Sequence, residues 1–147
     1  MLLAASHRGL TGAWFEGQRH GPTQCPWAIE PNHPLLVQAC AALDAYFGAT
    51  PTLATIAYVP IDLSAGTAFQ QQVWQALRSI APGTVTTYSE LSASLGCPNS
   101  VRAVAAAIGK NPVSIVVPCH RVIGKNGQLV GYAGGLPRKA HLLAHEQ

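Results

Sequence analysis

Charge is scarce in this sequence of 147 residues: only 10% of them are Asp, Glu, Lys or Arg, whereas 48% are hydrophobic. That composition excludes an intrinsically disordered chain and supplies enough apolar material for a core. The sequence also lacks an apolar run of about 18 residues, so we expect no membrane-spanning helix. Its start, MLLAASHRG, lacks the basic region and the length of a signal peptide. We therefore expect a compact soluble protein of the cytoplasm, without a membrane partner.

Cysteine is scarce as well, and it is scattered along the chain. The four cysteines show neither the close pairs of a zinc ribbon nor the density of a secreted disulfide scaffold. They are Cys25, Cys40, Cys97 and Cys119. We expect reduced thiols, no structural metal and no disulfide framework.

Acidic residues are rare in the second half of the chain. Residues 78–147 carry seven bases and two acids, whereas residues 1–77 carry two bases and four acids. The basic half is therefore expected to face any polyanion.

The first part of the chain has the pattern of a small α/β unit. Short apolar runs at 2–5 and 10–15 predict a β-hairpin. Apolar residues at helical spacing predict a helix over 34–47, with Cys40 as part of its buried stripe. Residues 48–66, rich in Gly, Pro and Thr, have the composition of a linker.

A capping box marks the start of the next helix. Thr67 and Gln70 have the spacing that lets each side chain bond the backbone of the other residue. Trp74 lies beside the apolar stripe and is expected in the core rather than in a ligand site. That stripe consists of Phe69, Val73, Leu77 and Ile80.

The following segment predicts a helix, a turn and a second helix. Thr87 and Glu90 form another potential capping box, and a turn rich in Gly and Pro ends the first helix. Asn99 or Ser100 can cap the second helix, which is expected to run to about Lys110. The pattern is that of a helix-turn-helix, although many helical hairpins share it.

The second of these helices is almost free of long side chains, with Arg102 as the exception in its first turns. Its four alanines suit helix propensity and close packing. They equally suit a helix that lies against a nucleic-acid groove and inserts one arginine. The pattern alone leaves both interpretations open. The alanines are Ala103, Ala105, Ala106 and Ala107.

The stretch VVPCHRVIG, residues 116–124, places Cys119 beside His120. Two ligands are too few for a metal, and a purely structural cysteine would have two polar residues as poor core neighbours. A nucleophilic thiol explains more, because a nearby histidine and positive charge stabilise a thiolate. A turn after Pro118 could bring the imidazole round to the sulfur, and metal and structural roles remain the alternatives.

A catalytic histidine usually needs a third group that orients it. The basic half offers two carboxylates, Glu90 and Glu146. Glu90 is expected to be used in helix capping. That leaves Glu146, near the end of the chain, as the partner of His120.

Four motifs in order give the chain a resemblance to a known family. PCHRV at 118–122 is preceded by NP at 111–112 and followed by GYAGG at 131–135 and LLAHE at 142–146. Together they resemble the O6-alkylguanine-DNA alkyltransferases. The resemblance implies an enzyme that repairs DNA by moving the alkyl group of O6-alkylguanine, or of O4-alkylthymine, irreversibly to its own cysteine, without a cofactor.

The resemblance also implies roles for the site residues. Cys119 would accept the alkyl group, and His120 would act as the base through a bridging water. Glu146 would hold and polarise His120, and Asn111 would fix the turn that carries the cysteine. Tyr88 would help to rotate the target phosphate and would donate a proton toward the leaving guanine.

The implied partner is double-stranded DNA containing O6-alkylguanine, bound by a monomer through the minor groove. A cysteine in a protein interior cannot reach an atom inside a stacked duplex, so the target base must be flipped into a pocket. Arg102 would fill the gap, and small side chains on its helix suit a narrow groove. Tyr88, Ser89 and Lys125 are expected as further DNA contacts.

The segment KNGQLVGYAGG, residues 125–135, would close over the flipped base in such a protein. Gly131, Tyr132 and Ala133 are expected to line the substrate pocket, and the glycines allow close backbone approach. Ala133 stands where some members carry serine, which removes a hydroxyl. Without the family, this segment predicts a plain hairpin turn.

The fold expected from these patterns is a mixed α/β (α+β) protein. Residues 1–62 would form a small sheet-plus-helix domain, shortened because most members have a further strand with an SPLG-like segment before this point. Residues 63–147 would form a mainly helical domain with a winged helix-turn-helix. A non-catalytic alkyltransferase-like lesion-binding protein is the main alternative, but such proteins replace the cysteine. A transcription regulator and a thiol hydrolase are further alternatives.

Overall fold

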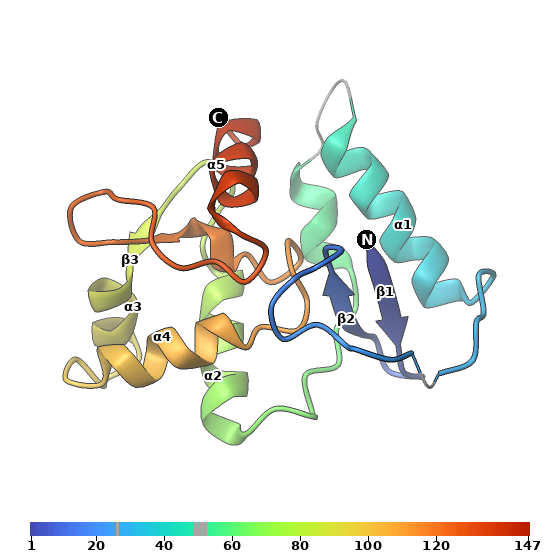
Figure 1. Ribbon diagram of the computed structural model, residues 1–147, viewed down its shortest axis with the longest axis horizontal. Coiled ribbons are helices and arrows are strands. Elements are labelled where there is room, and N and C mark those ends of the chain that lie inside the picture. Colours follow the sequence, from blue (N-terminus) through green and yellow to red (C-terminus); the bar gives the residue numbers. More distant parts are fainter. Residues whose placement is uncertain (26, 49–52) are drawn as a thin grey trace.

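The computed structural model describes residues 1–25, 27–48 and 53–147 as a mixed α/β fold. Figure 1 shows the N-terminal hairpin and helix α1 on one side of the molecule and helices α2 to α5 on the other. The segment that follows strand β2 extends from the hairpin toward the helical half. This arrangement confirms the expected fold class.

The N-terminal hairpin and helix have the predicted bounds. Strand β1 (Leu2–Ala5) pairs antiparallel with β2 (Leu10–Trp14), and Leu2 lies opposite Trp14. Helix α1 spans Pro34–Phe47, with proline in its first turn. Both elements were recognisable because their apolar spacing and their boundary residues lie within the segments themselves.

Cys40 does not belong to the buried stripe of α1, so the prediction for this residue was wrong. Its side chain is exposed. The buried residues of α1 are spaced three and four positions apart and form one narrow face of the helix. Cys40 lies about 100° around the helix from Ala39, so it lies outside that face. The buried residues of α1 are Ala39, Ala42, Leu43 and Tyr46.

The expected linker is largely packed structure in its described part, whereas its residues 49–52 lie outside the described residues. A 3₁₀ helix spans Leu53–Tyr58 and buries Ile56. Leu10 then bonds through its backbone to Pro60 and Asp62, at 2.8 and 2.9 Å. The composition of the segment, rich in Gly, Pro and Thr, did not reveal that Ile56 would be buried. The division into domains at residue 62 stays a prediction.

Helix α2 (Ala68–Arg78) begins at the predicted capping box. Gln70 N donates to Thr67 Oγ1 at 3.2 Å, and Thr67 N donates to Gln70 Oε1 at 2.9 Å. Trp74 is buried, as expected, and its indole N–H donates to the carbonyl of Ala107 at 2.8 Å. Phe69, by contrast, is exposed, because it lies in the first turn at the outer edge of the stripe.

Helices α3 (Tyr88–Ser94) and α4 (Val101–Gly109) form the predicted helical hairpin. The capping box of Thr87 and Glu90 is present, and Gly96 at φ 74° makes the turn possible. Ser100 is the N-cap residue of α4, but its side chain makes no capping bond, so that part of the prediction was wrong.

The N-terminal hairpin supports the segment that carries the cysteine. Ala13 of β2 donates its N–H to Pro112 O and accepts from Ser114 N, both at 2.9 Å.

Strand β3 (Thr86–Thr87) pairs in parallel with β4 (Val122–Ile123), just after the cysteine, and α5 spans Leu136–His145. Among the described residues, no helix has the length and hydropathy to cross a membrane.

Candidate active site

Cys119 lies in a 3₁₀ turn, Cys119–Arg121, which begins after Pro118 as the sequence predicted. The cysteine is 5% exposed. Asn111, which follows the end of α4, stabilises this turn. Its Nδ2 donates to Val117 O at 2.8 Å and to Cys119 Sγ at 3.0 Å. Its Oδ1 accepts from Val113 N at 3.0 Å. One amide side chain thus fixes both ends of the loop and the sulfur itself.

The same loop contains a strained residue that sequence reasoning did not find. Ile115 has φ 74° and is fully buried. A β-branched residue in the left-handed region costs about 1–3 kcal/mol, and such strain persists only where the surroundings enforce it. The bonds of Asn111 and the packing of the isoleucine side chain supply that constraint.

His120 is bound to Glu146, as the sequence suggested. Nε2 of the imidazole lies 2.8 Å from Glu146 Oε1, and both side chains are fully buried. Burial lowers the pKa of His120 and outweighs the opposing effect of Glu146, so the ring is neutral near pH 7. An ionised carboxylate only accepts hydrogen bonds, so Nε2 carries the proton. The free lone pair is on Nδ1, which is buried without a hydrogen-bond partner.

Two further side chains bind Glu146, and the sequence analysis missed both. Arg121 donates from Nε to Oε2 and from Nη2 to Oε1, each at 2.8 Å. Tyr46 of α1 donates its hydroxyl to Oε1 at 2.6 Å. Burial alone would raise the pKa of Glu146, but the hydrogen bonds from His120 and Arg121 prevail and hold it well below its ordinary value. Glu146 is therefore a permanently ionised partner of His120.

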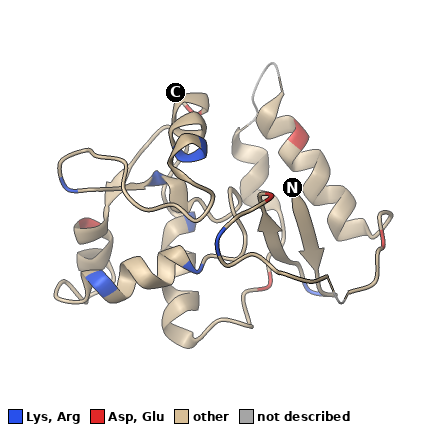
Figure 2. Ribbon diagram, viewed as in Figure 1, with Lys and Arg blue, Asp and Glu red and all other residues tan. Residues whose placement is uncertain are grey.

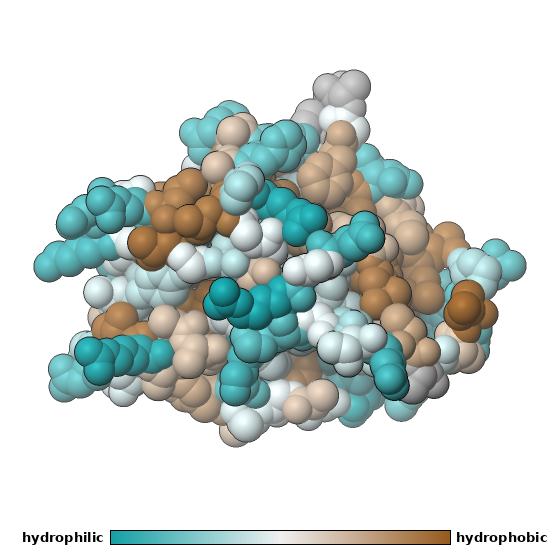
Figure 3. All heavy atoms as spheres, viewed as in Figure 1, coloured by the Kyte–Doolittle hydropathy of each residue, from teal (hydrophilic) through white to brown (hydrophobic). Residues whose placement is uncertain are grey.

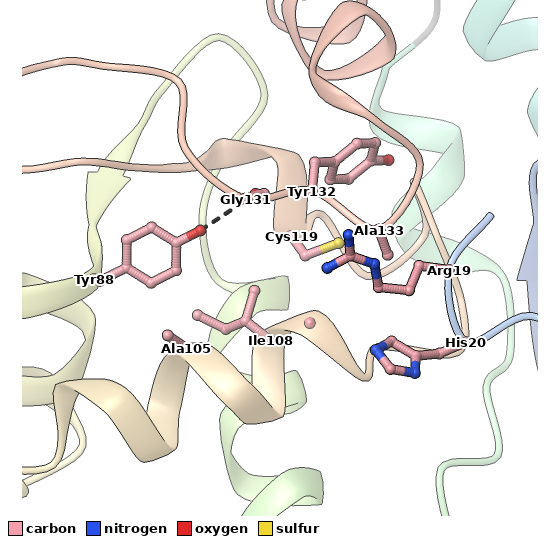
Figure 4. Close-up of a pocket in the computed structure, with 10 residues that line it drawn as sticks. Arg19, His20, Tyr88, Ala105, Ile108, Cys119, Gly131, Tyr132 and Ala133 are labelled. Carbon is pink, nitrogen blue, oxygen red and sulfur yellow. Dashed lines mark hydrogen bonds between the residues drawn. The ribbon is translucent and has the colours of Figure 1, made fainter.

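Cys119 opens into a pocket of about 230 Å³ between the two halves of the molecule (Figure 4). Figure 4 shows Arg19, Cys119 and Tyr132 among the side chains that line this pocket. Arg19 and His20, from the segment after β2, are pocket residues that the sequence analysis did not identify. The lining residues are Arg19, His20, Tyr88, Ala105, Ile108, Gly109, Cys119, Gly131, Tyr132 and Ala133.

Two side chains hold the loop that covers this pocket. Tyr88 donates its hydroxyl to Val130 O at 3.1 Å. The fully buried Lys139 of α5, another residue that the sequence analysis missed, donates to the same oxygen at 2.9 Å and to Val122 O at 2.6 Å. Burial lowers the pKa of Lys139 to about 8. Gly131, at φ 53°, provides the backbone bend at this point.

The resting state of Cys119 is the thiol. Burial raises its pKa, although the hydrogen bond from Asn111 and the charge of Lys139 act in the opposite direction. Because the reactive form of cysteine is the thiolate, the site needs a base that removes the proton during the reaction. His120 supplies a neutral imidazole on the next residue.

The remaining predicted residues lie outside the pocket. Arg102 is exposed on α4, Ser89 is exposed at the start of α3, and Lys125 is exposed in the loop before α5. Figure 2 shows a basic residue at the outer end of α4 and another at the tip of this loop. Arg121 and Lys139 are internal, so two of the seven bases of residues 78–147 do not contribute to the surface.

These features define a class of protein: a helix-turn-helix fold with a buried cysteine that lines a pocket and precedes a histidine bound to a buried carboxylate. The chain belongs to the family of 6-O-methylguanine DNA methyltransferases, because the model of that family's DNA-binding domain matches residues 68–147. Among the described residues, no group of three His, Cys, Asp or Glu side chains could hold a metal ion.

Comparisons with individual proteins agree with this family, and two of the three matches below cover nearly the whole chain. A Mycobacterium leprae protein named methylated-DNA–protein-cysteine methyltransferase is 42% identical over 147 residues, 100% of this chain and 86% of its own length. A protein of that name from Salmonella typhimurium is 64% identical over 81 residues, 55% of this chain and 47% of its own. The crystal structure of Mycobacterium tuberculosis OGT in complex with DNA matches with a TM-score of 0.87 at 41% identity, covering 98% of this chain and 84% of that one.

Proposed function

We propose that this chain repairs DNA by direct reversal, transferring the alkyl group of O6-alkylguanine to Cys119. One observation carries the proposal: the sulfur of Cys119 faces a pocket and is followed by a neutral histidine whose partner is a buried carboxylate. A lesion-binding protein without catalysis would need none of these groups. The full-length relative named for methyl transfer to cysteine supports the catalytic interpretation.

The reaction forms a carbon–sulfur bond and breaks the bond between the alkyl carbon and O6 of guanine. His120 Nδ1 accepts the thiol proton through a water molecule, and Glu146 stabilises the imidazolium that results. The displaced guanine takes up one proton at a ring nitrogen. Tyr88 would donate that proton from the pocket wall, and the proton on the imidazolium would replace it by way of solvent, so that one proton in all passes from the thiol to the guanine. Because the thioether is stable, each molecule reacts once. O4-alkylthymine presents the same kind of bond and is a second substrate of the same step.

DNA is proposed to bind along the outer side of α3 and α4. Ala103 and Ala106 are exposed on α4 together with Arg102. Most side chains on this surface are therefore short, and one long cationic side chain projects from it. That shape fits a minor groove, where Arg102 would occupy the space of the flipped base. Ser89 lies at the N-terminus of α3, where backbone N–H groups favour a phosphate, and Lys125 would contact the backbone.

The flipped base is proposed to occupy the pocket over Cys119. Tyr132 would lie against the alkyl group, and Gly131 and Ala133 would let the base approach the loop backbone closely. Gly134 is required behind this wall, because a Cβ there would lie 2.8 Å from the Tyr132 ring and 3.0 Å from Phe15. A side chain at this position would displace the tyrosine.

The distribution of surface residues supports this orientation. Exposed large hydrophobic side chains are more numerous in the N-terminal part, although Figure 3 shows brown atoms on both sides of the molecule. They include Ile29, Val37 and Tyr58. Exposed cations lie mainly in the helical half, so a polyanion would meet that half first.

Intact-mass measurement tests the proposal. After incubation with a duplex that contains one O6-methylguanine, the protein should gain the mass that corresponds to replacing one proton by a methyl group. Peptide mapping should locate the methyl group on Cys119, and Cys119→Ser should bind the duplex without a mass change. Tight binding of the unmodified protein without any gain in mass would instead favour the lesion-binding alternative.

Binding to undamaged duplex should weaken as salt is added. Cations that neutralise phosphates release counterions, and a surface with three to five contacts should give a log–log slope of about −2.7 to −4.5. Fluorescence anisotropy at several salt concentrations measures the slope, and Lys125→Ala should make it less steep by about one. Binding that does not depend on salt would exclude the helical half as the DNA surface.

We also propose that the protein acts as a monomer in the cytoplasm. The pocket and its catalytic groups come from one chain. A nucleophilic thiol must stay reduced, and the reducing cytoplasm maintains that state.

A further inference from the structure

The carboxylate of Glu146 is shared between the two halves of the molecule. Its Oε1 accepts hydrogen bonds from His120 and Arg121, which belong to the cysteine turn, and from Tyr46 of α1. Tyr46 is 100 positions away in the sequence and is fully buried. Its bond, at 2.6 Å, is shorter than the 2.8 Å contact between His120 and the same oxygen.

Tyr46 acts as a permanent hydrogen-bond donor. Burial and the neighbouring charge of Glu146 raise its pKa far above the ordinary value, so the phenol keeps its proton in any solution in which the protein is folded. The ring is held in place by Phe47, at 4.8 Å between ring centroids, and by His145, at 5.1 Å. The hydroxyl therefore has a fixed direction toward Glu146.

We propose that Tyr46 is a positioning residue for the alkyl transfer: its hydroxyl keeps Glu146 ionised and less basic, and so keeps His120 neutral with Nδ1 free to accept the proton of Cys119. The inference rests on the proposed function, in which His120 is the base. It gives the N-terminal helix a part in the chemistry, because α1 supplies one of the four hydrogen bonds that Glu146 accepts from side chains.

The sign of the effect follows from the charges around the imidazole. Glu146 favours protonation of His120, whereas Arg121, Lys139 and burial disfavour it. A hydrogen bond from Tyr46 draws negative charge on Oε1 toward the phenol, which weakens the attraction between Glu146 and an imidazolium. A thiolate at Cys119 would act in the same direction as Glu146. Removal of the hydroxyl should therefore make His120 easier to protonate.

Tyr46→Phe tests this inference, because it retains the ring and removes the hydroxyl. The pKa of His120, followed by NMR in a Cys119→Ser background, should rise by about 0.5–1 unit. With Cys119 present, the acidic limb of the pH–rate profile of alkyl transfer should move to higher pH, whereas the rate on the alkaline side should stay nearly unchanged. Tyr58→Phe, at a tyrosine that is 79% exposed, is the matched control and should change neither quantity.

Three outcomes separate the possibilities. A lowered melting temperature with an unchanged pKa of His120 and an unchanged pH profile would overturn the inference, since the hydroxyl would then be purely structural. A shifted pKa of His120 in a protein that never transfers an alkyl group would leave the hydrogen-bond coupling intact and reject the proposed function. If Tyr46→Phe does not fold, the Tyr46 hydroxyl proton of the unsubstituted protein decides: its NMR resonance should shift as His120 titrates, and a resonance that does not respond overturns the inference.

Discussion

Arg121→Leu is expected to destabilise the folded protein by about 3–5 kcal/mol, because it leaves the buried carboxylate of Glu146 without its strongest partner. Arg121 makes both of its bonds to Glu146 at 2.8 Å and is itself 3% exposed. The remaining donors to Glu146 are neutral, so the variant would bury an uncompensated negative charge.

Urea denaturation at about pH 7 measures this loss as a lower transition midpoint at constant slope. Arg102→Leu, at an exposed arginine, should change stability by less than about 0.5 kcal/mol and serves as the control. Adding Glu146→Gln to Arg121→Leu should recover part of the loss, because no charge then remains unpaired. If Arg121→Leu proved as stable as the unsubstituted protein, the carboxylate could not be the buried anion that the site requires.

Arg102→Ala is expected to reduce the rate of repair in duplex DNA by about 30- to 100-fold, because unstacking a base costs a few kcal/mol and, in the proposed function, the arginine takes the place of the base in the stack. The same variant should react with free O6-benzylguanine within about twofold of the normal rate, because no base has to be flipped. Arg102 is exposed on α4 and does not line the pocket. A comparison of the rates on duplex DNA and on the free base therefore separates its effect on base flipping from any effect on the transfer step.

Single-turnover kinetics with both substrates measure this difference. Lys110→Ala, which removes an exposed cation near the end of α4, is the matched control. It should weaken binding modestly and change the salt dependence without a selective loss of repair. Equal loss on duplex and free base in Arg102→Ala would contradict the assignment, since the substitution would then have damaged the pocket.

The local sequence predicted α1, α2 and the hairpin of α3 and α4, whereas it did not predict α5. The capping boxes at Thr67 and Thr87 and the bounds of α1 were predictable because the interacting groups lie within four residues of each other. Cys119 and His120 were recognisable as a pair because they are adjacent, whereas Asn111 was identified only through the resemblance to the family. Residues on the border of an apolar stripe were less predictable, as Cys40 and Phe69 show, since the width of the neighbouring element decides which of them is covered.

Only the tertiary structure decided the electrostatics of the site. Arg121 and Lys139 read as surface cations in the sequence, but in the structure both are buried and satisfied, one by a carboxylate and the other by carbonyl groups. Tyr46 reaches Glu146 across 100 positions, and Ile115 holds a strained φ that its neighbours enforce. The physical reason is that burying a charge or a strained backbone is unfavourable in isolation and becomes favourable only when partners distant in the sequence converge on it.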